Sequence, residues 1–478
     1  MEFEPVIGLE VHAQLLTKSK LFCACSTKFG DPPNTNICPV CTGQAGALPV
    51  LNKEAVVMAI KAGLSLHCEI QEKSIFARKN YFYPDLPKGY QISQYEFPIC
   101  LSGKLEIAVD GKAKTITIQR IHMEEDAGKL LHEGGHPDES NIDLNRCSTP
   151  LIEIVSGPDL DNPKEAVEYL KKLRNILVYL GVCDGNMQEG SLRCDANISV
   201  RPKGSKKLGT RTEIKNVNSF KYIENALNYE IKRQIEVIES GGKIVQETRL
   251  YNQEKNTTET MRSKEEAHDY RYFPDPDLLP LIVDKKWVET VAKSLPELAE
   301  EKAARFTQSF KIPEYDAKVL TAEKPLADYF EECVKLYDAP KKLSNWIMAE
   351  LMRELKERDI DVTAIQMKPK QLAEMVQLID EGTISGAIAK KVFMEVLDSG
   401  KDPEKIIEEK GWKQVSDTSA IEPIIDKILA NNQENVERYK SGKTNVLGFF
   451  VGAVMKETKG QANPQIINEL LKKKLDQK

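Results

Sequence analysis

The sequence lacks several features that would define common classes of protein. It has no apolar run of the roughly 18 residues that a membrane-crossing helix needs, and it opens on a strand pattern in place of a signal peptide. Its 67 Lys and Arg are outnumbered by 73 Asp and Glu, for a net charge of −6. We therefore expect a cytoplasmic protein with no membrane partner, in which any contact with nucleic acid is local.

Motifs for nucleotide binding and for nucleophilic catalysis are also missing. The chain has no GxxxxGK[ST], and no GxGxxG between a strand and a helix, which argues against a P-loop or Rossmann site. It has no GxSxG or Ser/His/Asp signature either, which argues against a serine hydrolase. Phosphoryl transfer by carboxylates, a metal ion and basic side chains remains compatible with the sequence.

The length of 478 residues predicts two to four domains. Strand and helix patterns mix up to about residue 292, and helical patterns dominate afterwards. We predict an α+β fold. An N-terminal domain built on antiparallel sheets spans residues 1–292, an all-helical domain spans 293–405, and a small helical tail spans 406–478.

Four of the ten cysteines stand at metal-ligand spacing. Cys23 and Cys25 form one pair and Cys38 and Cys41 a second, and the turn-forming stretch GDPPNTNI between them has little to bury. Four thiolates close a tetrahedral zinc site and leave no open position, so the sequence predicts a structural zinc knuckle over residues 23–41. The alternative is four reduced cysteines without a metal.

The stretch VIGLEVHAQL, residues 6–15, alternates as a strand that is buried on one face. Glu10 and His12 share its polar face, where a divalent cation could use both. The alternative is an ordinary half-exposed strand.

Further acidic residues lie on or at the ends of other predicted strands. Glu124 and Glu125 end the second strand of a hairpin, and Glu153 interrupts the apolar run LIEIV. Converging carboxylates with one imidazole suit Mg²⁺, which takes oxygen ligands and leaves positions open for phosphate oxygens. A last strand, within residues 187–202, carries three polar side chains on one face: Arg193, Asp195 and Asn197.

Residues 77–98 are dense in aromatic, proline and basic residues and fit neither a helix nor a regular strand. A long irregular segment inside a compact domain is commonly a shaped site or an interface. The alternative is a surface loop anchored by tyrosines.

Several blocks of the sequence together resemble the GatB family, the B subunits of the bacterial tRNA-dependent amidotransferases. The tail resembles that family's YqeY-like C-terminal domain, and the resemblance covers essentially the whole chain in order. The blocks are GLEVHAQL, CAC…CPVC, RKNYFYPDLPKGYQISQ, HMEEDAGK, LNRCSTPLIEIV, EGSLRCDANISVRP and RYFPDPDLLP, with GFFVGAVMKETKGQANP in the tail.

The resemblance implies one component of an enzyme that converts Glu-tRNA(Gln) or Asp-tRNA(Asn) to the cognate amide. It implies ATP and Mg²⁺ as cofactors for phosphorylating the side-chain carboxylate, and ammonia that comes through a channel from the amidase, or A subunit, of the same enzyme. A small C subunit would tie the two together, and the C-terminal domain would hold the tRNA.

The resemblance also suggests roles for particular residues. The Mg²⁺ ligands would be Glu10, His12, Glu125 and Glu153, with Glu124 and Asp195 at a second ion or behind the first ligands. Arg193 and Asn197 would contact phosphate or substrate. Lys79, Tyr81 and Lys88 would line the mouth of the ammonia channel or neutralise phosphate.

Two readings from other classes compete with this one. The first is a zinc-containing nucleic-acid-binding protein without catalysis, and the second is a non-catalytic assembly scaffold that docks partners through its proline-aromatic segments. ATP turnover that depends on Glu125 would separate the enzyme from both.

Overall fold

The computed structural model describes residues 2–131, 141–263, 270–413, 418–458, 462 and 464–476. Contacts divide the chain into two units, Met1–Leu298 and Ala299–Lys478. The first unit mixes strands and helices and the second is helical, so the predicted α+β class is confirmed. The finer division at residues 292 and 405 stays a prediction.

A nine-stranded sheet forms the first unit, in the order β14-β13-β12-β11-β1-β10-β7-β6-β2. All neighbours pair antiparallel except β12 and β13, which run parallel, so the sheet is mixed where the sequence predicted antiparallel sheets. Its strands are β1 (Phe3–Gln14), β2 (Glu69–Ile70), β6 (Cys100–Val109), β7 (Lys112–Glu125), β10 (Pro150–Ser156), β11 (Leu192–Pro202), β12 (Thr212–Lys215), β13 (Glu247–Asn252) and β14 (Thr257–Ser263).

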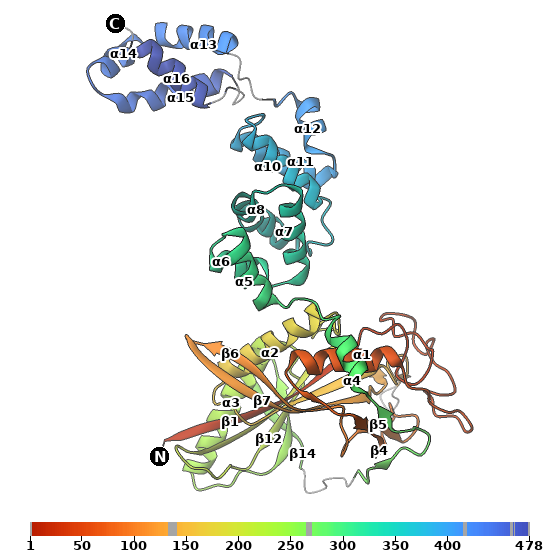
Figure 1. Ribbon diagram of the computed structural model, residues 1–478. Coiled ribbons are helices and arrows are strands. Elements are labelled where there is room, and N and C mark those ends of the chain that lie inside the picture. Colours follow the sequence, from red (N-terminus) through yellow and green to blue (C-terminus); the bar gives the residue numbers. More distant parts are fainter. Residues whose placement is uncertain are drawn as a thin grey trace. The chain divides into compact units, whose positions relative to one another are not determined.

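Smaller sheets flank the large one. One has three strands in the order β15-β4-β5, and the other two pair β16 with β3 and β8 with β9. Their strands are β3 (Lys73–Ser74), β4 (Phe76–Asn80), β5 (Tyr90–Gln94), β8 (Lys129–Leu131), β9 (Asn141–Asp143), β15 (Phe273–Pro274) and β16 (Leu281–Ile282). The helices of this unit are α1 (Lys53–Ser65), α2 (Pro163–Tyr179), α3 (Phe220–Glu239) and α4 (Lys285–Ala292) (Figure 1).

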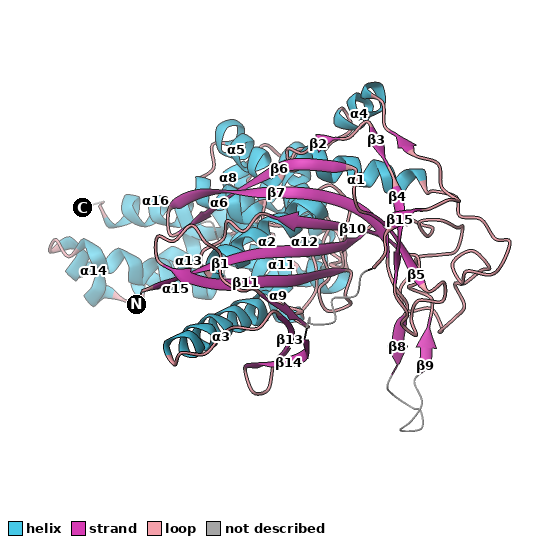
Figure 2. Ribbon diagram, turned by 90° about the horizontal axis from the view of Figure 1, so that it is seen from below, coloured by secondary structure: helices cyan, strands magenta, loops and turns pink. Residues whose placement is uncertain are grey.

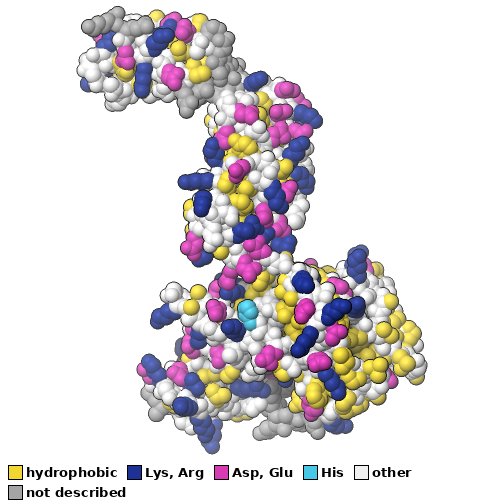
Figure 3. All heavy atoms as spheres, viewed as in Figure 1, with side chains coloured by type: hydrophobic (Ala, Val, Ile, Leu, Met, Phe, Trp, Pro, Cys, Tyr) yellow, Lys and Arg dark blue, Asp and Glu magenta, His cyan; other side chains and the backbone are white. Residues whose placement is uncertain are grey.

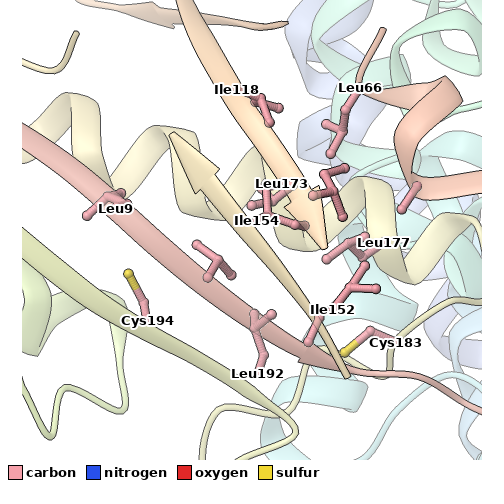
Figure 4. Packing of buried hydrophobic residues seen from close by; sticks show 14 of the residues in the cluster. Leu9, Leu66, Ile118, Ile152, Ile154, Leu173, Leu177, Cys183, Leu192 and Cys194 are labelled. Carbon is pink, nitrogen blue, oxygen red and sulfur yellow. The ribbon is translucent and has the colours of Figure 1, made fainter. Parts of the chain in front are cut away.

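One face of the large sheet is apolar and packs against helix α2. The alternation predicted for β1 is confirmed: Leu9 and its apolar neighbours are buried, whereas Glu10 and His12 lie on the other face. Figure 4 shows Leu173 and Leu177 of α2 among the buried side chains of the strands. Because helices fill this face, the polar side chains of the same strands gather on the opposite one.

The second unit contains two hydrophobic clusters. One lies among the helices before residue 411 and the other among those after residue 417. The first set is α5 (Ala299–Phe310), α6 (Glu314–Leu320), α7 (Lys324–Leu336), α8 (Pro340–Trp346), the π-helix Ile347–Leu351, α9 (Met352–Arg358), α10 (Pro369–Asp380), α11 (Gly386–Ser399) and α12 (Pro403–Lys410). The second is α13 (Thr418–Ala430), α14 (Gln433–Lys440), the 3₁₀ turn Thr444–Val446, α15 (Leu447–Glu457) and α16 (Pro464–Leu475). Among the described helices, none combines the length and apolarity needed to cross a membrane.

Candidate active site

The polar face of the large sheet carries side chains in rows that run across its central strands. Strands β11, β1, β10 and β7 lie side by side (Figure 2). In one row His12 on β1 stands between Arg193 on β11 and Glu153 on β10, and Glu153 in turn faces His122 on β7. In the next row Glu10 stands beside Asp195. The strand register thus brings residues that are far apart in the sequence together on one polar surface.

Two imidazoles and two carboxylates meet at the centre of this surface. The Nε2 atoms of His12 and His122 each lie 3.3 Å from Oε2 of Glu153. The same two nitrogens lie 3.8 and 3.7 Å from oxygens of Glu124, which also accepts a hydrogen bond from the buried Ser93 hydroxyl. We refer to His12, His122, Glu124 and Glu153 as the central cluster.

Charge is balanced within the central cluster by the two histidines. Burial alone would lower the pKa of His122, but the Glu153 and Glu124 carboxylates raise it to about 9. Burial likewise opposes protonation of His12, and Glu153 raises its pKa above the ordinary value. Conversely, the two imidazoles hold the pKa of Glu153 well below its usual range against the effect of burial. A cation bound here would take over the role of these protons.

The donor set of the central cluster fits a divalent metal ion. One ligand atom each from His12, Glu124 and Glu153 lies within 4.8 Å of the others. Nearby, burial and the charges of Glu153, Glu213 and Asp195 raise the pKa of Glu10, so negative charge is in excess on this side of the cluster. Carboxylates concentrated in this way are stabilised by a cation.

Glu125 does not join the central cluster. Successive side chains of a strand point to opposite faces, so Glu125 is directed away from the face that carries Glu124. It is buried and forms an ion pair with Lys88, and it accepts a hydrogen bond from the backbone N–H of Ile92. Burial alone would lower the pKa of Lys88, but the Glu125 carboxylate raises it. The structure therefore groups Lys88 with Glu125 on the other side of β7.

Asp126 lies next to the cluster and is held by two arginines. Its carboxylate pairs with Arg193 at 2.9 Å and Arg146 at 3.7 Å and accepts a hydrogen bond from Gln14. These charges keep the pKa of the buried Asp126 below its ordinary value, although burial opposes them. The predicted phosphate contact Arg193 is thus already engaged by a carboxylate.

A second polar group surrounds Glu10. The Asn197 side chain donates a hydrogen bond to Glu10 at 2.9 Å, and Asp195 pairs with Lys215 at 2.7 Å. Lys215 also lies 3.2 Å from Glu213. The predicted residues Glu10, Asp195 and Asn197 are therefore brought together: Glu10 and Asp195 lie in the row beside the central cluster, and Asn197 lies one row further on.

A cavity of about 380 Å³ opens beside Glu10. Apolar side chains supply part of its wall, and Glu10, Asn197, Gln119 and Arg211 supply polar groups. Its remaining lining includes Val6, Val155, Pro158 and Leu208. A cavity with apolar walls and a few polar groups is the usual form of a small-molecule site.

Tyrosines from two distant segments form a cluster with Lys79. The Lys79 ammonium lies 4.8 Å from the ring centre of Tyr270 and 5.8 Å from that of Tyr81. Tyr272 stacks on Tyr95 at 4.2 Å. Burial, Asp85 and Glu124 raise the pKa of Tyr81, which indicates that this aromatic cluster adjoins the acidic site. Lys79 and Tyr81 are thus together, while Lys88 lies with Glu125.

The four cysteines predicted to bind zinc converge. Their Sγ atoms lie within 4.8 Å of one another, a spacing that can hold a metal ion. A hydrogen bond with Cys23 and the nearby Lys20 ammonium help to lower the pKa of Cys41 to about 4, although burial opposes this. All ten cysteines of the chain are free thiols. The set of four thiols fits zinc in tetrahedral coordination.

Sequence reasoning missed His122 and Lys215. His122 lies two residues before Glu124 on the same strand, so the two side chains share a face, and this spacing was a usable signal. Lys215 had no such signal, because its position depends on the pairing of β11 with β12.

Two family models match the chain. The GatB/GatE catalytic domain matches residues 5–289, which contain the sheet and both clusters of candidate ligands, and the GatB domain matches residues 328–475. The fold and site thus define the class: an α+β catalytic domain with two clusters of side chains that could hold metal ions, followed by helices. The chain belongs to the GatB family, and the resemblance predicted from the sequence is confirmed.

Full-length relatives agree with this assignment. A protein of Geotalea daltonii is 61% identical over 477 residues, 99% of this chain and 100% of its own length. One of Geotalea uraniireducens is 60% identical over 478 residues, covering both chains completely, and one of Geobacter sulfurreducens is 57% identical over 477 residues, 99% of this chain and 100% of its own. Each is named as the B subunit of an aspartyl/glutamyl-tRNA(Asn/Gln) amidotransferase.

Proposed function

We propose that this chain is the ATP-dependent component that converts Glu-tRNA(Gln), Asp-tRNA(Asn) or both to the amidated aminoacyl-tRNA. The observation that carries the proposal is the central cluster of buried and half-buried carboxylates and imidazoles beside a cavity, within a domain of the GatB family. The site provides what phosphoryl transfer requires, namely positioning and charge stabilisation, without any protein nucleophile.

The reaction proceeds in two steps. A side-chain carboxylate oxygen of the aminoacyl group attacks the γ-phosphorus of ATP, the bond to the bridging oxygen breaks, and ADP leaves. Ammonia then adds to the acyl carbon, loses a proton, and phosphate departs. Activation is needed because a free carboxylate is a poor acylating agent, and exclusion of water protects the acyl phosphate.

The residues divide between the cation and the nucleotide. His12, Glu124 and Glu153 would hold Mg²⁺, which supplies charge neutralisation for the phosphates, with Glu10 and Asp195 available to a second ion. The cavity next to Glu10 would take the nucleoside part of ATP against its apolar wall.

Lys79, Tyr81 and Lys88 are proposed to line the route of ammonia. Lys79 and Tyr81 belong to the aromatic cluster that adjoins the acidic site. Lys88 lines a second cavity of about 290 Å³ together with Tyr90 and residues of the cysteine-bearing segment. Polar side chains such as these can pass a small neutral molecule by hydrogen bonding.

The partners proposed are the amidase, or A subunit, together with the small C subunit. In support, large apolar side chains are exposed on one side of the first unit, where Figure 3 displays a gathering of hydrophobic atoms. Leu279 is 90% exposed, Phe82 87% and Val50 75%. A gathering of exposed large apolar side chains is characteristic of a docking surface, here assigned to the amidase.

Two further assignments complete the proposal. The C-terminal helices would bind tRNA, with the basic last turn of α16 (Lys472, Lys473 and Lys474) as a local source of positive charge. Zinc bound by Cys23, Cys25, Cys38 and Cys41 would fix the knuckle. We place the protein in the cytoplasm, in keeping with its free thiols.

An isotope experiment tests the proposed chemistry. Glu-tRNA(Gln) labelled with ¹⁸O in the side-chain carboxylate is incubated with the complex, ATP and glutamine, and the released phosphate is examined by mass spectrometry. Reaction through an acyl phosphate transfers one ¹⁸O to phosphate for each amide formed. Amide formation with unlabelled phosphate would refute the mechanism, and Asp-tRNA(Asn) is tested in the same way.

A further inference from the structure

A β-bulge interrupts strand β7 beside the candidate active site. Val155 of β10 pairs with Arg120, but its neighbour Ser156 pairs with Ile118, so Gln119 is an extra residue on β7. A bulge bends the strand and redirects side chains, and bulges are frequent next to active sites. Here Gln119 lines the cavity, and Arg120 has the same parity as His122.

The guanidinium of Arg120 is incompletely satisfied. Its Nε atom is buried and has no hydrogen-bond partner in the described part of the chain. Arg193, on the same face of the sheet, is by contrast paired with Asp126. A buried donor without a partner costs free energy, so its retention calls for a ligand that accepts the hydrogen bond.

The surroundings of Arg120 connect it to the central cluster. Burial is the main cause that raises the pKa of Tyr272, the Glu124 and Glu153 charges add to the rise, and Arg120 opposes it. The Tyr272 hydroxyl therefore lies within electrostatic reach of both Arg120 and the two carboxylates. Arg120 also follows directly on a residue of the cavity wall.

We propose that Arg120 is a catalytic residue that binds the phosphoryl group during its transfer from ATP. Arginine has a planar fork of donors that matches phosphate oxygens, and it keeps its charge under all relevant conditions. A fixed positive group between the cavity beside Glu10 and the central cluster would stabilise the negative charge of the transferring phosphoryl group. This inference rests on the proposed function and adds a residue to it.

The test measures binding of two nucleotides to the full chain, co-expressed with its proposed partners. One probe is the non-hydrolysable analogue AMPPNP in the presence of Mg²⁺, and the other is AMP. The binding of each is measured by isothermal titration calorimetry. The variants are Arg120→Gln, Arg120→Lys and, as a matched control, Arg201→Gln. Arg201 lies on β11 of the same sheet and pairs with Glu4 at 2.7 Å.

Arg120→Gln should bind AMPPNP about 10- to 100-fold more weakly than the wild type, because it has lost a charged hydrogen-bond donor. AMP binding should be unchanged, because AMP lacks the terminal phosphates, and this also shows that the variant is folded. Arg120→Lys should recover part of the affinity, and Arg201→Gln should match the wild type.

Unchanged AMPPNP affinity in Arg120→Gln would overturn the proposal. If that variant binds AMPPNP normally but has a raised KM for misacylated tRNA, Arg120 serves the aminoacyl carboxylate and the assignment to phosphate is wrong. Equal weakening for AMPPNP and AMP would also contradict it. Failure of the wild type to bind AMPPNP would refute the proposed function itself, and the Arg120 role with it.

Discussion

The substitution Glu153→Gln tests whether the carboxylate of Glu153 holds the central cluster together in the absence of metal. Its Oε2 atom lies 3.3 Å from the Nε2 atoms of both His12 and His122. The variant keeps the size of the side chain and removes its charge. We therefore expect the protonated forms of both imidazoles to lose their main stabilising partner.

The magnitude follows from the pKa of His122. A rise from the ordinary value of 6.5 to about 9 corresponds to about 3 kcal/mol in favour of the protonated imidazole, at about 1.4 kcal/mol for each pKa unit. Because the folded pKa exceeds the unfolded one, this stabilisation is complete below pH 6.5 and is lost as the pH rises through about 9. Glu153→Gln should remove much of it and flatten this pH dependence.

The assay is an NMR titration of ¹³C-labelled histidine rings in metal-free protein. The chain has six histidines, so the resonance of His122 can be assigned by substitution. We expect its pKa to fall by about one unit or more in Glu153→Gln, since burial alone lowers it. The control Glu106→Gln, at an exposed position of β6, should leave it unchanged. An unaltered His122 titration in Glu153→Gln would refute the reasoning.

Two further predictions concern the zinc site and a buried ion pair. Cys38→Ser should reduce bound zinc, measured by elemental mass spectrometry, from about one per chain to near zero. The control Cys68→Ala, outside the cysteine cluster, should retain its zinc, and equal zinc in both variants would contradict the assignment. Glu230→Gln should lower the free energy of unfolding of the first unit by about 3 kcal/mol at pH 7, because Glu230 is fully buried against Arg233 and Arg249. Burial would raise the pKa of Glu230, but Arg233 and other hydrogen-bond donors hold it below its ordinary value. The difference in unfolding free energy between variant and wild type should therefore shrink as the pH falls through the folded pKa. Urea unfolding at several pH values measures this, and a difference independent of pH would count against the account.

Local patterns in the sequence were sufficient to predict much of the fold. The alternation of β1 gave its buried face correctly, and Asn162, Pro163 and Gly181 marked the ends of helix α2. The Asn162 side chain caps the helix by accepting a hydrogen bond from the backbone N–H of Glu165, one of the N–H groups that the first turn leaves without a partner inside the helix. These features depend on neighbours in sequence, so they were predictable.

Features that depend on strand pairing were not accessible in the same way. Of the acids after Met123, Glu125 was expected as a Mg²⁺ ligand and Glu124 at a second ion or behind the first ligands. The pleat of β7 sends the two side chains to opposite faces, and it is Glu124 that joins the central cluster. The parallel pairing of β12 with β13 and the bulge at Gln119 have no local signature in the chain. Each of them arises from the register of segments distant in sequence.

The most direct test of the central claim is turnover of ATP by the assembled complex, measured as phosphate released with and without misacylated tRNA. The wild type and Arg201→Gln should be stimulated by Glu-tRNA(Gln), Asp-tRNA(Asn) or both. Glu153→Gln should lose this stimulation, with kcat lowered by about 100-fold or more, while still binding the tRNA. Normal turnover by Glu153→Gln would contradict the assignment of phosphoryl transfer to the central cluster.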